Sequence, residues 1–140
     1  SERKFKTWIT PHNKEFSRLF PNIKSENNIQ RALDAAREFN ISILLKGANS
    51  IVADNKRAWQ LFGTDSQTAR AGLGDLLSGF LAGSSAIDLT ICRNIKTDFF
   101  AKYVLLHSFA ASNCKTGSNA SDIASELSKL IRNGKTRQIS

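Results

Sequence analysis

Apolar and polar residues recur along the chain with two different periods, which predict alternating strands and helices. Between residues 25 and 40, apolar residues return at spacings of three and four, the period of an amphipathic helix. These residues are Ile29, Leu33, Ala36 and Phe39. The almost continuous apolar run 41–45 is typical of a strand buried on both faces. Further strands are predicted at 6–10, 50–54 and 57–62, and further helices at 13–20, from residue 72 onward, at 97–112 and at 121–132.

Turn-forming residues separate these elements. Pro11 ends the first strand, and Asn13 is a suitable N-cap for the helix that follows. Asn40 can close the amphipathic helix, and residues 54–56 form a plausible hairpin turn between two short strands. The resulting order of strands and helices predicts an α/β fold.

Composition excludes several classes of protein for this chain. The 140 residues are 41% hydrophobic and 23% charged, enough for one domain with a core and too apolar for disorder. No apolar run is long enough to span a membrane, and the first residues lack a secretory signal, so no membrane partner is expected. Cys92 and Cys114 match no metal-ligand spacing, which indicates a reducing, cytoplasmic location.

The net charge of +8 says little about the binding partner, because basic and acidic residues are interleaved along the sequence. No dense basic stripe with interspersed aromatic residues is present, and we expect no nucleic-acid partner. A general preference for anionic ligands, including nucleotides, remains compatible with this charge.

A first candidate site follows the most buried strand. It consists of Lys46, Gly47, Ala48, Asn49 and Ser50. Ligands gather at the carboxyl ends of strands in open α/β sheets, where a glycine allows close approach and a lysine attracts phosphate. A lysine-glycine pair at a strand end is also common in plain turns.

A second candidate lies where a helix opens. Gly72 and Gly74 alternate just before it, an arrangement that exposes backbone N–H groups to an anion. Asp75 falls in the first turn. It is either a helix-stabilising acid or a carboxylate placed to take a proton from a substrate hydroxyl.

The two histidines carry weaker signals. His12 follows the first strand, where a turn histidine is more often structural than catalytic, and His107 sits among apolar residues as a hydrogen-bonded core histidine would. No catalytic triad and no metal cluster can be argued from the residue spacing, so we expect no metal ligands.

In this order, three segments resemble one family. Residues 10–19 resemble its Thr-Pro-His-Pro-Gly-Glu-x-x-Arg-Leu segment, and residues 45–53 its Leu-Lys-Gly-Ala-x-Thr strand and turn. Residues 69–83 resemble its Gly-x-Gly-Asp helix opening. The family is the ADP/ATP-dependent NAD(P)H-hydrate dehydratase, within the ribokinase-like superfamily.

The resemblance implies a repair enzyme that restores NADH or NADPH from the S form hydrated at C6 of the nicotinamide ring. Dehydration would be coupled to hydrolysis of ADP or ATP, with Mg²⁺ as the phosphate counter-ion. Asp75 would contact the substrate and act as the base, and His12 would contact the hydrated dinucleotide. Residues 46–50 with Gly72 and Gly74 would bind the nucleotide.

The resemblance also implies that residues 1–140 form a single, partial domain, the C-terminal half of a three-layer α/β/α fold. An N-terminal remainder of the same protein and a homo-oligomer are then expected partners. The sequence departs from the family pattern at Asn13 and Lys14, which stand where the family has Pro-Gly, and in the loop 63–70.

Two other functions stay open. A ribokinase-like small-molecule kinase uses the same glycine-aspartate element to activate an acceptor hydroxyl. A non-catalytic nucleotide-binding module would fit the altered loop before Gly72. The segment around His12 favours the dehydratase.

Overall fold

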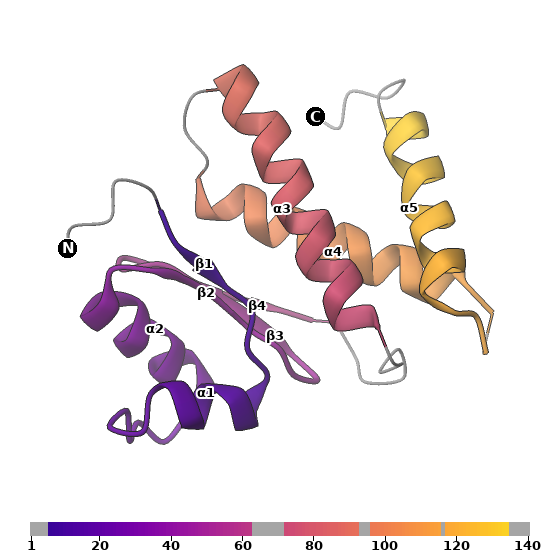
Figure 1. The fold of residues 1–140 in the computed structure, drawn as a ribbon. Coiled ribbons are helices and arrows are strands. Elements are labelled where there is room, and N and C mark those ends of the chain that lie inside the picture. The colour runs from indigo at the N-terminus through magenta and orange to yellow at the C-terminus, as the bar shows by residue number, and fades with distance from the viewer. Residues whose placement is uncertain (1–5, 63–71, 93–95, 116, 135–140) are drawn as a thin grey trace. The chain divides into compact units, whose positions relative to one another are not determined.

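The computed structural model describes residues 6–62, 72–92, 96–115 and 117–134. The chain divides into two compact units, one made of Ser1–Ser66 and Lys96–Ala101, the other of Gln67–Ile95 and Lys102–Ser140. The first unit holds a sheet with helices and the second holds helices, which confirms the predicted α/β class (Figure 1). Each unit is described by itself below.

The sheet of the first unit has four strands in the order β1-β2-β3-β4. The strands are β1 (Trp8–Ile9), β2 (Ser42–Leu45), β3 (Ser50–Ala53) and β4 (Ala58–Leu61). β1 pairs in parallel with β2, and the other pairs are antiparallel. The predicted hairpin turn is confirmed, because Asp54 Oδ1 accepts hydrogen bonds from the backbone N–H groups of Lys56 and Arg57, both at 2.8 Å.

Helices α1 (Asn13–Leu19) and α2 (Asn28–Phe39) cover one face of this sheet (Figure 1). All residues of β2 and β3 are buried, which confirms the expectation from the apolar run. Leu44 and Val52 pair across the two strands on the pleat opposite the α1–α2 core, and neither has exposed surface. On β1, the Trp8 ring lies 4.1 Å from that of Phe100, between ring centroids.

Helix α2 buries only part of the predicted face, since Ala36 is buried and Leu33 packs partly buried against the core, as expected. Ala32, Ala35 and Ala36 have no exposed surface, whereas Ile29 and Phe39 are 38% and 41% exposed. Small side chains let the helix backbone lie close to the sheet, which leaves the larger residues at the margin. The helix also begins later than residue 25, because Asn27 caps it, and it ends as predicted at Asn40, whose φ is 48°.

In its described residues, the second unit consists of three helices. They are α3 (Leu73–Cys92), most of α4 (Thr97–Asn113) and α5 (Ala120–Gly134). One core cluster of this unit is formed by Leu73, Ala110, Ala111, Ile123 and Leu127. None of the helices in the described ranges is long and apolar enough to cross a membrane.

Helix α3 opens on a glycine in the left-handed conformation, with φ of 82° at Gly72. The Gly72 carbonyl accepts the N–H of Leu76 at 2.9 Å, so this residue starts the helical hydrogen-bond pattern. Gly79 lies further along α3, where an added Cβ would meet no atom within 4 Å. The two glycines therefore differ in backbone conformation and not in available space, since a Cβ at Gly72 would meet only Ala120 Cβ, at 3.9 Å.

We predict opposite effects of alanine at these two positions. Gly72→Ala forces an L residue into a left-handed conformation and should lower the free energy of unfolding by about 1–2 kcal/mol. Gly79→Ala should raise it by roughly 0.5–1 kcal/mol, because alanine favours a helix over glycine. Urea unfolding of the intact protein measures both, and equal destabilisation by the two substitutions would contradict the assigned φ.

Candidate functional site

Two segments that are distant in sequence meet at the carboxyl ends of β1 and β2. His12 and Lys46 form a parallel β-bridge just beyond the two strands. The backbone N–H of Lys46 donates to the Pro11 carbonyl at 2.8 Å. The structure thus brings together the predicted substrate-contacting histidine and the first residue of the predicted nucleotide turn.

His12 itself is the N-cap of α1, a role that the sequence analysis assigned to Asn13. Its Nδ1 accepts the backbone N–H of Glu15 at 3.1 Å, and Glu15 Oε2 accepts the backbone N–H of His12 at 2.8 Å. This is a reciprocal capping box. Because Nδ1 is an acceptor, a neutral His12 carries its proton on Nε2, which lies 3.4 Å from Glu15 Oε1.

Glu15 is a site residue that the sequence analysis did not single out. The pKa of the Glu15 carboxyl lies below its usual range, mainly because the carboxylate accepts a hydrogen bond from the backbone N–H of His12. The positive charges of Lys46 and Arg18 act in the same direction. The spacing of three residues between His12 and Glu15 was the available signal, since it is that of a capping box.

The turn after β2 presents its backbone to solvent. Gly47, Ala48 and Asn49 are exposed, whereas Ser50 is 6% exposed and forms the start of β3. The Ser50 hydroxyl donates to the Gly47 carbonyl at 3.3 Å. A Cβ at Gly47 would meet only ordinary contacts, at 3.8 Å and 3.9 Å, so the fold itself does not require glycine there.

Asn13, which departs from the family pattern, has a structural partner. Its Oδ1 accepts a hydrogen bond from Arg31 Nη1 of α2 at 3.3 Å. The Arg31 guanidinium also lies 4.8 Å from the centre of the Phe16 ring. Asn13 and Arg31 thereby join α1 to α2 beside the turn, a contact that proline could not make.

The second candidate site belongs to the second unit. Asp75 is exposed in the first turn of α3, and the Gly74 carbonyl accepts the Ser78 hydroxyl at 2.8 Å. Gly72 has the left-handed conformation already described. The altered loop 63–70 lies outside the described residues. The structure therefore places His12 beside Lys46 in the first unit. Gly72, Gly74 and Asp75 belong to the second unit.

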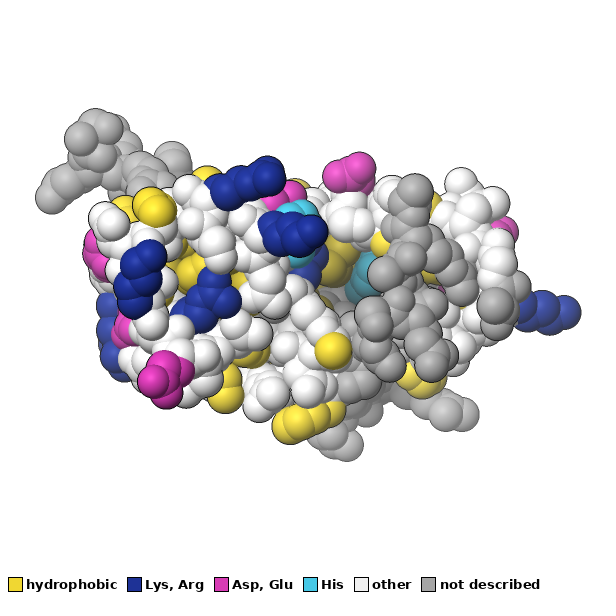
Figure 2. Space-filling model, turned by 90° about the horizontal axis from the view of Figure 1, so that it is seen from below, with side chains coloured by type: hydrophobic (Ala, Val, Ile, Leu, Met, Phe, Trp, Pro, Cys, Tyr) yellow, Lys and Arg dark blue, Asp and Glu magenta, His cyan; other side chains and the backbone are white. Residues whose placement is uncertain are grey.

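Other chemistry is sparse in the part of the chain that the structure describes. No group of three or more His, Cys, Asp or Glu side chains could hold a metal ion there. His107 is buried as predicted, and burial lowers its pKa. Its Nε2 makes no hydrogen bond with the described residues, contrary to the expected hydrogen-bonded histidine. On the face in Figure 2, Lys and Arg side chains are interspersed with Asp and Glu.

Solved structures identify the class of fold. A ribokinase-like superfamily protein from Enterococcus faecalis has a TM-score of 0.73 at 22% identity, over 90% of this chain and 44% of that one. The ADP/ATP-dependent NAD(P)H-hydrate dehydratase from Bacillus subtilis, co-crystallised with ATP/Mg²⁺, has a TM-score of 0.72 at 18% identity, over 95% and 50%. The fold is therefore that of the ribokinase-like proteins.

Sequence comparison identifies the family within this class. The family model described as NAD(P)H-hydrate dehydratase matches residues 1–133, and the chain belongs to that family. A bifunctional NAD(P)H-hydrate repair enzyme from Synechocystis is 36% identical over 55% of this chain and 15% of its own length. An ADP-dependent (S)-NAD(P)H-hydrate dehydratase from Nitrosopumilus maritimus is 35% identical over 54% and 27%. The chain thus spans about half the length of these solved structures and a smaller share, 15% and 27%, of the length of these two relatives.

The capping role of His12 can be separated from any role of its ring. His12→Asn should leave the free energy of unfolding unchanged, because asparagine is among the best N-caps. His12→Ala should lower it by about 0.5–2 kcal/mol, since the N–H of Glu15 then lacks its acceptor. Urea unfolding of both variants tests this, and an equal loss in the two would show that the ring, not the cap, stabilises α1.

Proposed function

We propose that the protein carrying this chain dehydrates hydrated NADH and NADPH at the expense of ADP or ATP. The family match over residues 1–133 carries this proposal. The contact between the His12 segment and the Lys46 turn supports it, because both segments resemble the family's pattern. Phosphorylation explains the chemistry, since hydroxide is a poor leaving group and a phosphorylated hydroxyl leaves easily.

The turn at residues 46–50 is the proposed nucleotide subsite. Its exposed backbone can approach phosphate oxygens, and the Lys46 ammonium would balance their charge. Gly72 and Gly74 would contribute at the start of α3. Mg²⁺ commonly keeps several waters and is bound through phosphates with one or two carboxylates. The turn 46–50 has no carboxylate, so the ion would be held mainly through the nucleotide phosphates, whose charge it would neutralise.

Substitution of Gly47 tests the nucleotide subsite. Gly47→Ala should leave the unfolding free energy unchanged, because a Cβ fits there without strain. It should weaken ADP binding by about tenfold, because the added methyl group stands between the turn and a phosphate. Calorimetric titration with ADP measures the effect, with Gly83→Ala on α3 as the control glycine. Unchanged affinity in Gly47→Ala would remove the turn from the nucleotide site.

Asp75 is the proposed base, and His12 is the proposed contact for the hydrated dinucleotide. Asp75→Asn removes the proton acceptor and should slow dehydration by about a hundredfold or more. The assay is ADP-dependent recovery of the NADH absorbance from hydrated NADH by the intact protein. Asp122→Asn is the matched control, because Asp122 is likewise an acid in the first turn of a helix.

The same assay separates the alternatives. Activity that survives Asp75→Asn would contradict the assigned base. Nucleotide binding without recovery of NADH would point to a binding module, and phosphate transfer to another hydroxyl compound would point to a kinase. Loss of activity in the stable His12→Asn variant would assign the imidazole to the substrate.

We also propose that this chain is one part of a larger family domain in a cytoplasmic homo-oligomer, together with an N-terminal remainder. Apolar side chains on the second half of α3 support the presence of a covering partner. Ile87 and Ile91 are 62% and 72% exposed, and Leu89 is 49% exposed. Ile87 and Ile91 are four residues apart and share one face of the helix, and exposed apolar surface on one face often marks an interface.

A further inference from the structure

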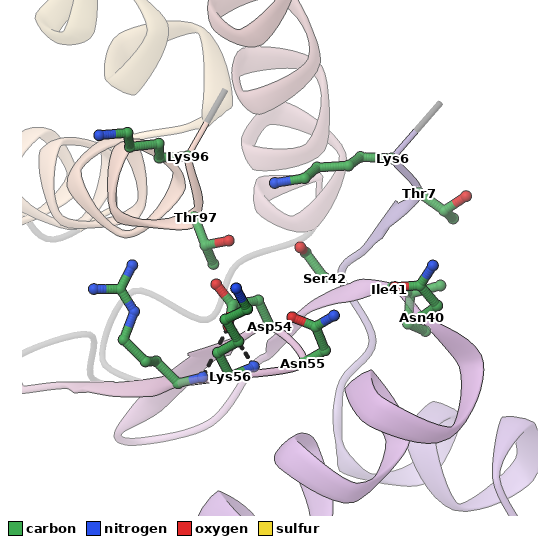
Figure 3. Close-up of a pocket in the computed structure, with 11 residues that line it drawn as sticks. Lys6, Thr7, Asn40, Ile41, Ser42, Asp54, Asn55, Lys56, Lys96 and Thr97 are labelled. Atoms are coloured by element: carbon green, nitrogen blue, oxygen red, sulfur yellow. Dashed lines mark hydrogen bonds between the residues drawn. The ribbon is translucent and has the colours of Figure 1, made fainter. Parts of the chain in front are cut away.

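A second hollow lies at the other end of the sheet from the Lys46 turn. Its volume is about 390 Å³, within the range of small-molecule sites. It is bordered by the residues before β1, the start of β2, the β3–β4 turn and the start of α4 (Figure 3). The lining residues all belong to the first unit.

Basic residues from three separate parts of the chain line this hollow. They are Lys6, Lys56, Arg57 and Lys96. Asp54 is the one carboxylate among the described lining residues. The lining therefore has a net charge of +3, which attracts an anion.

Asp54 is already engaged by the hairpin turn. Its Oδ1 accepts the N–H groups of Lys56 and Arg57. Partial burial would raise the pKa of Asp54, but these two N–H groups and the nearby Thr97 hydroxyl more than offset it and keep the pKa below its usual value. Asp54 therefore stays ionised and is already counted in the net charge of +3, while its Oδ1 is held within the turn.

The hollow also contains buried hydroxyl groups. Ser42 is 4% exposed and Thr97 is 2% exposed. Figure 3 shows both side chains directed into the space between β1, the β3–β4 turn and the start of α4. Thr97 Oγ1 is near enough to Asp54 to lower the pKa of that carboxyl, but it is buried and makes no hydrogen bond with the described residues. Leaving such a group unsatisfied is unfavourable, and a ligand acceptor would satisfy it.

We propose that this hollow binds the phosphate group of a small molecule. Lys56 and Lys96 supply charge from two sides, and the Thr97 hydroxyl donates to a phosphate oxygen. Charge-assisted hydrogen bonds of this kind are the strong ones in proteins. The site is separate from the proposed nucleotide turn, because Lys46 lies beyond the carboxyl end of β2 and Ser42 begins that strand.

The test uses the intact protein with Lys46→Ala, which removes the lysine of the proposed nucleotide turn and so weakens phosphate binding there. Calorimetric titration with inorganic phosphate and with pyrophosphate should show saturable binding of at least one of them. Adding Lys56→Ala and Lys96→Ala should weaken that binding by about tenfold or more. Lys102→Ala with Lys129→Ala, which removes two exposed lysines outside the hollow, is the charge-matched control and should leave the affinity unchanged.

Thr97→Val separates a ligand contact from a structural role. It should weaken phosphate binding by about threefold while leaving the melting temperature unchanged or higher, because a buried unsatisfied hydroxyl is removed. Absence of binding in the Lys46→Ala protein would overturn the proposal. Equal weakening by the Lys102/Lys129 control would overturn it too. Neither result depends on dehydratase activity, so failure of this phosphate site can be distinguished from failure of the proposed function.

Discussion

The parallel pairing of β1 with β2 is the constraint on which the first unit depends. The two strands are joined through α1 and α2, and their carboxyl ends must lie at the same edge of the sheet. The complete burial of β2 fixes its register, since a shift by one residue would exchange the side chains on its two faces. His12 and Lys46 therefore meet at a fixed place, with the exposed turn beside them.

Helix capping decides what the His12 ring can offer to a ligand. Nδ1 is occupied by the N–H of Glu15, so the remaining nitrogen carries the proton and acts as a donor. Protonation of the ring would remove the acceptor that caps α1. The local structure of this helix and the chemistry of the proposed substrate contact are thus determined by one side chain.

The sheet presents different chemistry at its two ends. At the carboxyl end of β2, exposed backbone and one lysine follow the strand directly. At the amino end, charge comes from side chains of several segments around the buried hydroxyl of Thr97. A phosphate at the first end would bind mainly to backbone groups, whereas one at the second would bind to side chains.

Local patterns in the sequence were sufficient for the buried strand at 41–45, the hairpin turn at Asp54 and the helix end at Asn40. Strand periodicity and turn chemistry involve only neighbouring residues, and the motif of the proposed nucleotide turn lies in one continuous stretch. The burial of Ala32 and Ala35 in place of the larger Ile29 and Phe39, and the cluster of Lys6, Lys56 and Lys96, depended on tertiary structure. Contacts between residues far apart in the chain decide both, because the local period does not distinguish which residues of the helix pack closest to the sheet or which lysines lie together.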